Sequence, residues 1–137
     1  MQVQKGELIG ELNAKMVTTT ITEITPMGIH MISNDVGQFM GKFNANHMET
    51  TTIFQNVDGT NEWETKAIET TNEGDMLVIS GRGTGNITGP GKISWQGVVT
   101  YMTKSPKLEW LNTTKGWVEG WIDQAKNEGH AKIYVMK

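Results

Sequence analysis

At 137 residues, the chain is long enough for one hydrophobic core but not for two, so we expect a single domain over residues 1–137. A net charge of −3 with scattered basic residues argues against nucleic-acid and membrane partners, and the absence of cysteine excludes disulfides and thiolate nucleophiles. The first sixteen residues carry charges and lack the apolar run of a signal peptide or membrane span, so we expect a cytoplasmic protein.

The first half of the chain alternates apolar and polar residues with the two-residue period of β-strands. Phe39 and Phe43 share one face of one such run, and Trp63 lies on the apolar face of another. Asp58-Gly59 separates two runs, and this dipeptide between extended segments is a strong hairpin signal. The pattern predicts strands over 16–24, 27–32, 37–45, 49–57 and 61–70.

The second half continues this alternation, and Trp95 and Tyr101 share one face of its most regular run. Ser105-Pro106 interrupts the pattern, and the stretch 105–112 is the one segment compatible with a helical turn. The pattern predicts strands over 75–83, 92–102, 108–112, 116–123 and 130–137.

About eight strands in hairpin order, joined by short polar turns, indicate an all-β fold. We predict a single eight-stranded antiparallel up-and-down barrel, because closure removes the unpaired edges that a flat sheet would leave. A two-sheet β-sandwich is the alternative.

Six glycines lie within residues 81–97, but their spacing fits neither the dinucleotide fingerprint nor a phosphate-binding loop. Gly81 and Gly83 are instead in phase with Leu77 and Ile79, so they are expected to face the interior. Two interpretations follow. Either an aromatic side chain from a neighbouring strand fills the space that they leave, or the space belongs to a ligand cavity.

Residues with catalytic or metal-binding chemistry are sparse. His30, His47 and His130 lie far apart without a recognisable ligand spacing, so we expect no metal site and no cofactor. Glu119 is in phase with Trp117 and Trp121, and two orientations are open. Facing inward, it would be a carboxyl group of raised pKa, suited to proton transfer. Facing outward, it would lie in water while the tryptophans cover an outer or intersubunit surface.

The run SWQGVVTYMTKSPKLEWLN at 94–112, followed by KGWVEGWID at 115–123, resembles an uncharacterised bacterial and archaeal family of calycin-like barrels related in shape to allene oxide cyclase and dirigent proteins. The resemblance implies an eight-stranded barrel, assembled as a homo-oligomer, with a lumen open at one end. Allene oxide cyclase isomerises a reactive fatty-acid epoxide without a cofactor, which suggests an enzymatic alternative. The resemblance transfers no active-site residue.

The leading hypothesis is a barrel whose lumen binds a small apolar molecule. The second is a cofactor-independent isomerase or cyclase with Glu119 as its acid or base. The third is a structural homo-oligomer with a filled barrel, in which outward tryptophans pack between subunits. The candidate ligand-binding residues are Phe39, Phe43, Trp63, Gly81, Gly83, Trp95, Tyr101, Trp117 and Trp121.

Overall fold

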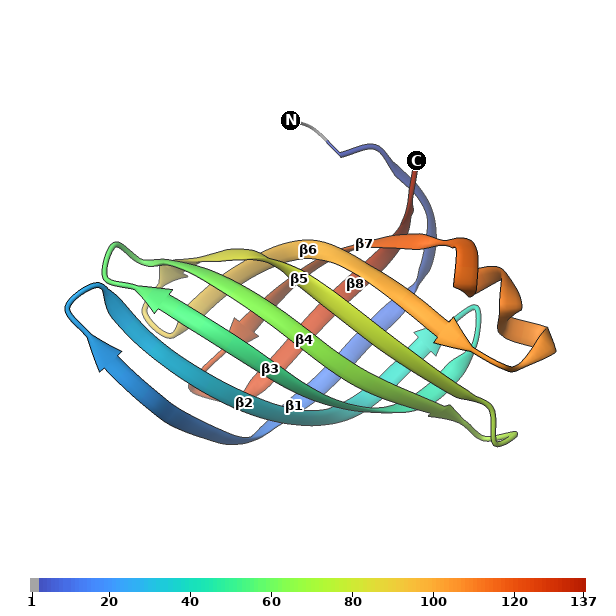
Figure 1. Cartoon of the computed structure of the whole chain (residues 1–137), viewed down its shortest axis with the longest axis horizontal. Helices are drawn as coiled ribbons and strands as arrows, with labels where there is room; N and C mark the ends of the chain where they lie inside the picture. The colour runs from blue at the N-terminus through green and yellow to red at the C-terminus, as the bar shows by residue number, and fades with distance from the viewer. Residues whose placement is uncertain (1–2) are drawn as a thin grey trace.

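The computed structural model describes residues 3–137 and shows a closed antiparallel barrel of eight strands (Figure 1). Each strand pairs with the next along the chain, and β8 pairs back to β1, so the predicted up-and-down barrel is confirmed. The elements are β1 (Lys5–Thr25), β2 (Gly28–Gly41), β3 (Asn44–Asn56), β4 (Thr60–Thr71), β5 (Met76–Gly89), β6 (Lys92–Thr103), the 3-10 helix η1 (Pro106–Thr113), β7 (Lys115–Asp123) and β8 (Glu128–Met136).

Alternation along the strands decides which side chains enter the barrel. In β4 every second residue from Asn61 to Glu69 is buried, while the residues between them are exposed. Trp63 and Ala67 therefore face the lumen, and Glu62 and Lys66 face solvent. A one-residue slip would exchange the two sets, so burial of the apolar set specifies the register.

Two predicted strands are wrong. The predicted strand 37–45 crosses the β2–β3 turn, because β2 ends at Gly41 and β3 begins at Asn44. The stretch 108–112 belongs to η1, which begins at Pro106, where proline is tolerated because the first helical N–H needs no partner within the helix. Leu108 and Leu111 are three residues apart, so a 3-10 helix places them on the same face. Both are buried in the core with Ile9 and Phe39.

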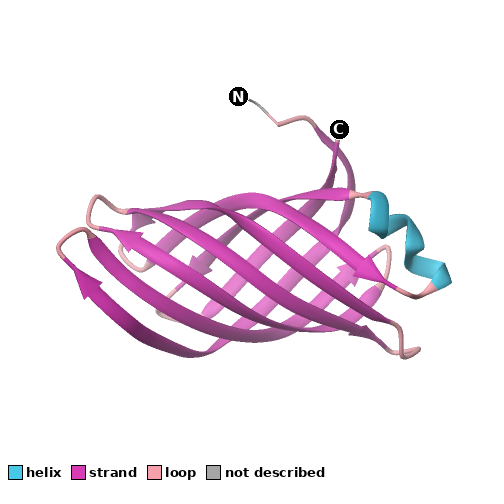
Figure 2. Cartoon of the chain, viewed as in Figure 1, coloured by secondary structure: helices cyan, strands magenta, loops and turns pink. Residues whose placement is uncertain are grey.

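The two ends of the barrel differ. Figure 2 shows η1 at one end, where it connects β6 to β7, and its two buried leucines belong to the core. The other end carries the short turns β1–β2, β3–β4, β5–β6 and β7–β8, with no helix across them in the described part of the chain. Within residues 3–137, no helix has the length and apolar character that a membrane span requires.

Candidate functional site

The barrel encloses a cavity of about 500 Å³ that extends toward the end opposite η1. Its volume lies in the range of small-molecule sites, and its walls are mostly apolar. Gln55, Asn61, Gln124 and Asn127 line it beside the turns of that end. The barrel is therefore not filled by side chains, which removes the filled lumen assumed in the structural alternative.

Both interpretations of the glycine-rich stretch apply in part. A Cβ added at Gly83 would meet the Trp63 ring at 2.6 Å, and one added at Gly120 would meet the Trp95 ring. The two tryptophans thus occupy the space that these glycines leave, and their rings contact edge to face at 5.5 Å. The cavity lies beside them, lined by both rings.

Four predicted aromatic residues line the cavity: Phe39, Trp63, Trp95 and Tyr101. Phe43 does not. It lies in the β2–β3 turn and stacks on Phe39 at 4.7 Å between ring centroids.

The other four predicted ligand-binding residues do not line the cavity either. Gly81 faces inward as predicted, but the Val99 side chain covers it, as Trp63 covers Gly83. Trp117 and Trp121 lie on the outer face because Val118 and Ile122 take the inward positions of β7. Trp121 is half exposed. The homo-oligomer that would cover it stays a prediction.

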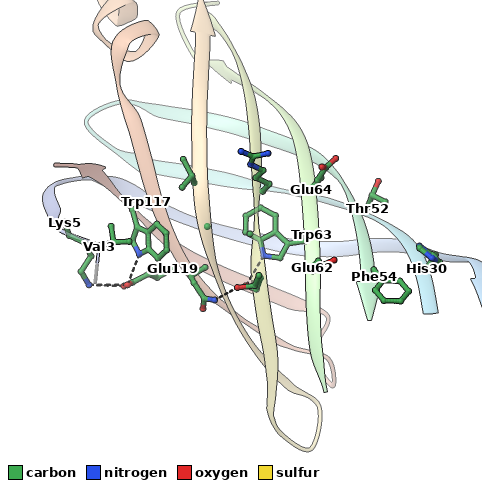
Figure 3. A pocket seen from close by; sticks show the side chains of 16 residues that line it. Val3, Lys5, His30, Thr52, Phe54, Glu62, Trp63, Glu64, Trp117 and Glu119 are labelled. Atoms are coloured by element: carbon green, nitrogen blue, oxygen red, sulfur yellow. Dashed lines mark hydrogen bonds and ion pairs between the residues drawn. The ribbon is translucent and has the colours of Figure 1, made fainter. Parts of the chain in front are cut away.

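Glu119 also lies outside the barrel, which is the outward one of the two orientations that the sequence left open. Its carboxylate accepts hydrogen bonds from Lys5 Nζ at 3.1 Å and from the Trp117 indole N–H at 3.0 Å. Figure 3 marks both with dashed lines. The indole hydrogen bond and, after it, Lys5 lower the pKa of Glu119. Lys5, Trp117 and Glu119 line a broad groove on the outer face of the barrel. The ionised carboxylate of Glu119, paired with Lys5 in this groove, does not reach the lumen. Glu119 cannot act on a molecule held inside.

A different set of ionisable groups lies on the cavity wall. His47 of β3 donates or accepts at both ring nitrogens, with Nδ1 2.8 Å from Oε2 of Glu69 and Nε2 2.6 Å from Oε1 of Glu49. Thr51 Oγ1 donates to Oε2 of Glu49 at 2.9 Å. Oδ1 of Asp35 is 3.8 Å from Nε2 of His47. We call Asp35, His47, Glu49 and Glu69 the acid cluster.

Strand register assembles the acid cluster from three neighbouring strands. Asp35 of β2 pairs with Glu49 of β3, and His47 of β3 pairs with Glu69 of β4. All four residues occupy inward positions and line the cavity. The side chains of Asp35, His47 and Glu69 are 7%, 4% and 3% exposed, so water does not screen their charges effectively.

Burial and neighbouring charges shift the titration of the acid cluster. Burial, with the Glu49 charge beside it, raises the pKa of Asp35 to about 7. Burial alone would lower the pKa of His47, but the hydrogen bonds that it donates to Glu49 and Glu69 outweigh burial and raise that pKa to about 10. The same His47 contact lowers the pKa of Glu49 despite its burial. His47 is therefore an imidazolium at neutral pH.

Sequence reasoning missed this cluster, although part of its signal was present. The spacing of the three histidines indicated no site, yet Glu49 follows His47 by two residues on the same face of a strand. Glu69 is likewise in phase with Trp63 and Ala67. Extending those alternations would have placed both carboxylates inside the barrel.

Comparison with known proteins establishes the fold. No family model matches the chain, and no curated protein matches its sequence. Among solved structures, it resembles a protein of unknown function from Clostridium acetobutylicum ATCC 824, with TM-score 0.83 and 15% identity over 96% of this chain and 98% of that one. A β-barrel-like protein from Acinetobacter baumannii AYE gives TM-score 0.78 and 16% identity over 100% and 98% of the two chains.

A third similar structure is an enzyme from Penicillium herquei, with TM-score 0.69 and 16% identity over 100% of this chain and 98% of that one. At these identities the likeness concerns the barrel alone. The relation to calycin-like, allene oxide cyclase and dirigent barrels stays a prediction.

Proposed function

We propose that the barrel binds a small, largely apolar molecule in its lumen. The observation that carries the proposal is the cavity of about 500 Å³, which combines aromatic and aliphatic walls with a few converging polar groups. Pockets of this kind are the usual sites of small-molecule recognition because apolar walls supply affinity and sparse polar groups fix orientation. The cavity reaches Gln55, Gln124 and Asn127 beside the turns of the end without η1, and we infer that the molecule enters there.

The uncharged fluorescent probe N-phenyl-1-naphthylamine tests this proposal. We expect saturable one-to-one binding with increased probe fluorescence. Ala67→Leu places extra volume in the cavity and should weaken binding by at least about tenfold, which corresponds to about 1.4 kcal/mol. Lys66→Leu, on the outer face of the same strand, is the matched control and should bind normally. Equal affinity in wild type and a folded Ala67→Leu variant would place the probe elsewhere and contradict the proposal.

A cofactor-independent isomerase or cyclase is the second candidate, and Asp35 favours it. This carboxyl group is buried against an apolar cavity, and its pKa of about 7 suits proton transfer near neutral pH. The similarity to a fungal enzyme is compatible with such a role. A probe reaction is 5-nitrobenzisoxazole opening, in which a base removes the C3 proton, the N–O bond breaks and a coloured cyanophenolate forms. Acceleration that survives in Asp35→Asn would exclude Asp35 as the base.

A further inference from the structure

The charged groups lining the cavity are unequal in sign. Three carboxyl groups, those of Asp35, Glu49 and Glu69, line it, whereas its basic side chains are two histidines. No lysine or arginine lines this cavity within residues 3–137. An anionic ligand such as a fatty acid would therefore enter a low-dielectric space that already holds like charges, where repulsion is strong.

The one buried cation of the acid cluster is already engaged. Both ring nitrogens of His47 are held by carboxylate oxygens, Glu69 on one side and Glu49 on the other. A metal ion would have to displace one of these contacts to reach an imidazole lone pair. An organic cation needs no such displacement, because it brings its own N–H donors to oxygens that remain free.

Two such oxygens are present. Oδ1 of Asp35 and Oε1 of Glu69 are buried and have no hydrogen-bond partner among the described residues. Their side chains are more than nine-tenths buried in the wall of the cavity. A buried acceptor without a partner costs about 1–3 kcal/mol, so a ligand that supplies a donor recovers that free energy.

We propose that the molecule bound in the lumen is a small cationic amine with an apolar body. Its ammonium group donates to Asp35, Glu69 offers a second acceptor, and its body packs on the aromatic side chains of Trp63 and Tyr101. Aromatic faces add attraction for a cation through their electron-rich π-systems. This inference rests on the proposed function and specifies the chemical class of its ligand.

The amine proposal predicts a pH dependence. The groups that face Asp35 are His47 and Glu49 from β3, with Glu69 beyond them on β4, while its inward-facing partner on β1 is the uncharged Met16. His47 keeps its proton up to a pKa of about 10, so Asp35, with its pKa of about 7, is the group that changes charge near neutrality. An ammonium group favours ionised Asp35. Affinity should therefore rise up to about tenfold per pH unit as pH approaches 7, and level off above it.

The test compares three indoles of similar size in calorimetric titrations and in displacement of N-phenyl-1-naphthylamine. Tryptamine carries an ammonium group, 3-propylindole is neutral, and indole-3-propionate is an anion. We expect tryptamine to bind at least about tenfold more tightly than 3-propylindole at pH 8, and indole-3-propionate to bind most weakly. Asp35→Asn should abolish the preference for tryptamine over 3-propylindole. Glu119→Gln, which removes a carboxylate from the outer face, should leave that preference unchanged.

Each outcome is decisive. Equal affinity for tryptamine and 3-propylindole, or tighter binding of indole-3-propionate, would overturn the amine proposal and leave the lumen as a binding site. Binding of Zn²⁺ or Mn²⁺ that depends on Asp35, without an amine preference, would also overturn it. If neither the indoles nor N-phenyl-1-naphthylamine bind, the proposed function itself fails. If Asp35→Asn does not fold, two other measurements test the amine proposal. They are the pH dependence of tryptamine affinity in the wild type and the preference for tryptamine over 3-propylindole in the Glu69→Gln variant.

Discussion

The lumen has two unlike walls, and the contrast between them explains how the barrel combines space with chemistry. The wall formed by β2, β3 and β4 carries the acid cluster. On the side formed by β5, β6 and β7, glycines such as Gly83, Gly97 and Gly120 let the Trp63 and Trp95 rings pack closely against the backbone. The wall of β2, β3 and β4 thus holds the ionisable groups. The glycines of β5, β6 and β7 leave room for the cavity and its aromatic lining in one small barrel.

Removing His47 should have the largest effect, because the polar wall depends on its positive charge. We expect His47→Leu to lower the free energy of unfolding by about 3–5 kcal/mol, since it leaves the Glu49 and Glu69 carboxyl groups buried without their shared donor. Urea denaturation followed by circular dichroism measures the change.

His30→Leu is the matched control for this substitution. The His30 side chain is 42% exposed and lies 3.8 Å from Glu23, so its replacement should cost less than about 1 kcal/mol. A loss in His47→Leu no greater than that in His30→Leu would show that the acid cluster does not depend on a buried imidazolium.

Adding a single methyl group to the glycine side should have the next largest effect. A Cβ at Gly83 would clash with the Gln96 carbonyl oxygen and approach the Trp63 ring to 2.6 Å. We expect Gly83→Ala to lower the free energy of unfolding by about 1–3 kcal/mol, because backbone and ring must both move. Gly89→Ala in the same strand is the control, since the nearest atom to its added Cβ is 4.0 Å away. Similar urea midpoints for the two variants would mean that close packing on Gly83 is not required.

These two walls also show why the fold was more predictable than the site. Alternation and turn residues are local signals, and they indicated the hairpin order of the barrel correctly. They also placed Trp63 and Gly83 inside, because each is in phase with apolar neighbours on its own strand. The strand prediction for 108–112 was wrong because a short apolar run fits a strand and a 3-10 turn equally well. Pro106 before this run favours the 3-10 helix.

The acid cluster depends on information that no single strand contains. His47 and Glu49 share a strand face, but Asp35 and Glu69 reach them only through the registers of β2 with β3 and of β3 with β4. Glu119 shows the same limit. Its phase with two tryptophans left both orientations open, and only the closed barrel places Val118 and Ile122 in the lumen and Glu119 outside.

The smallest effect is expected for Glu119, and it sharpens the contrast between carboxylates inside and outside the barrel. Glu119 and Lys5 form an ion pair whose side chains are 44% and 42% exposed, so water screens the attraction and solvates either group alone. Glu119→Gln should therefore lower the free energy of unfolding by at most about 1 kcal/mol, and the loss should shrink further in 1 M salt. The glutamine side chain also retains an oxygen acceptor, so the hydrogen bond from the Trp117 indole N–H is kept. A loss as large as that of His47→Leu would mean that charge on the outer surface matters as much as charge in the lumen, and the distinction between the two would not hold.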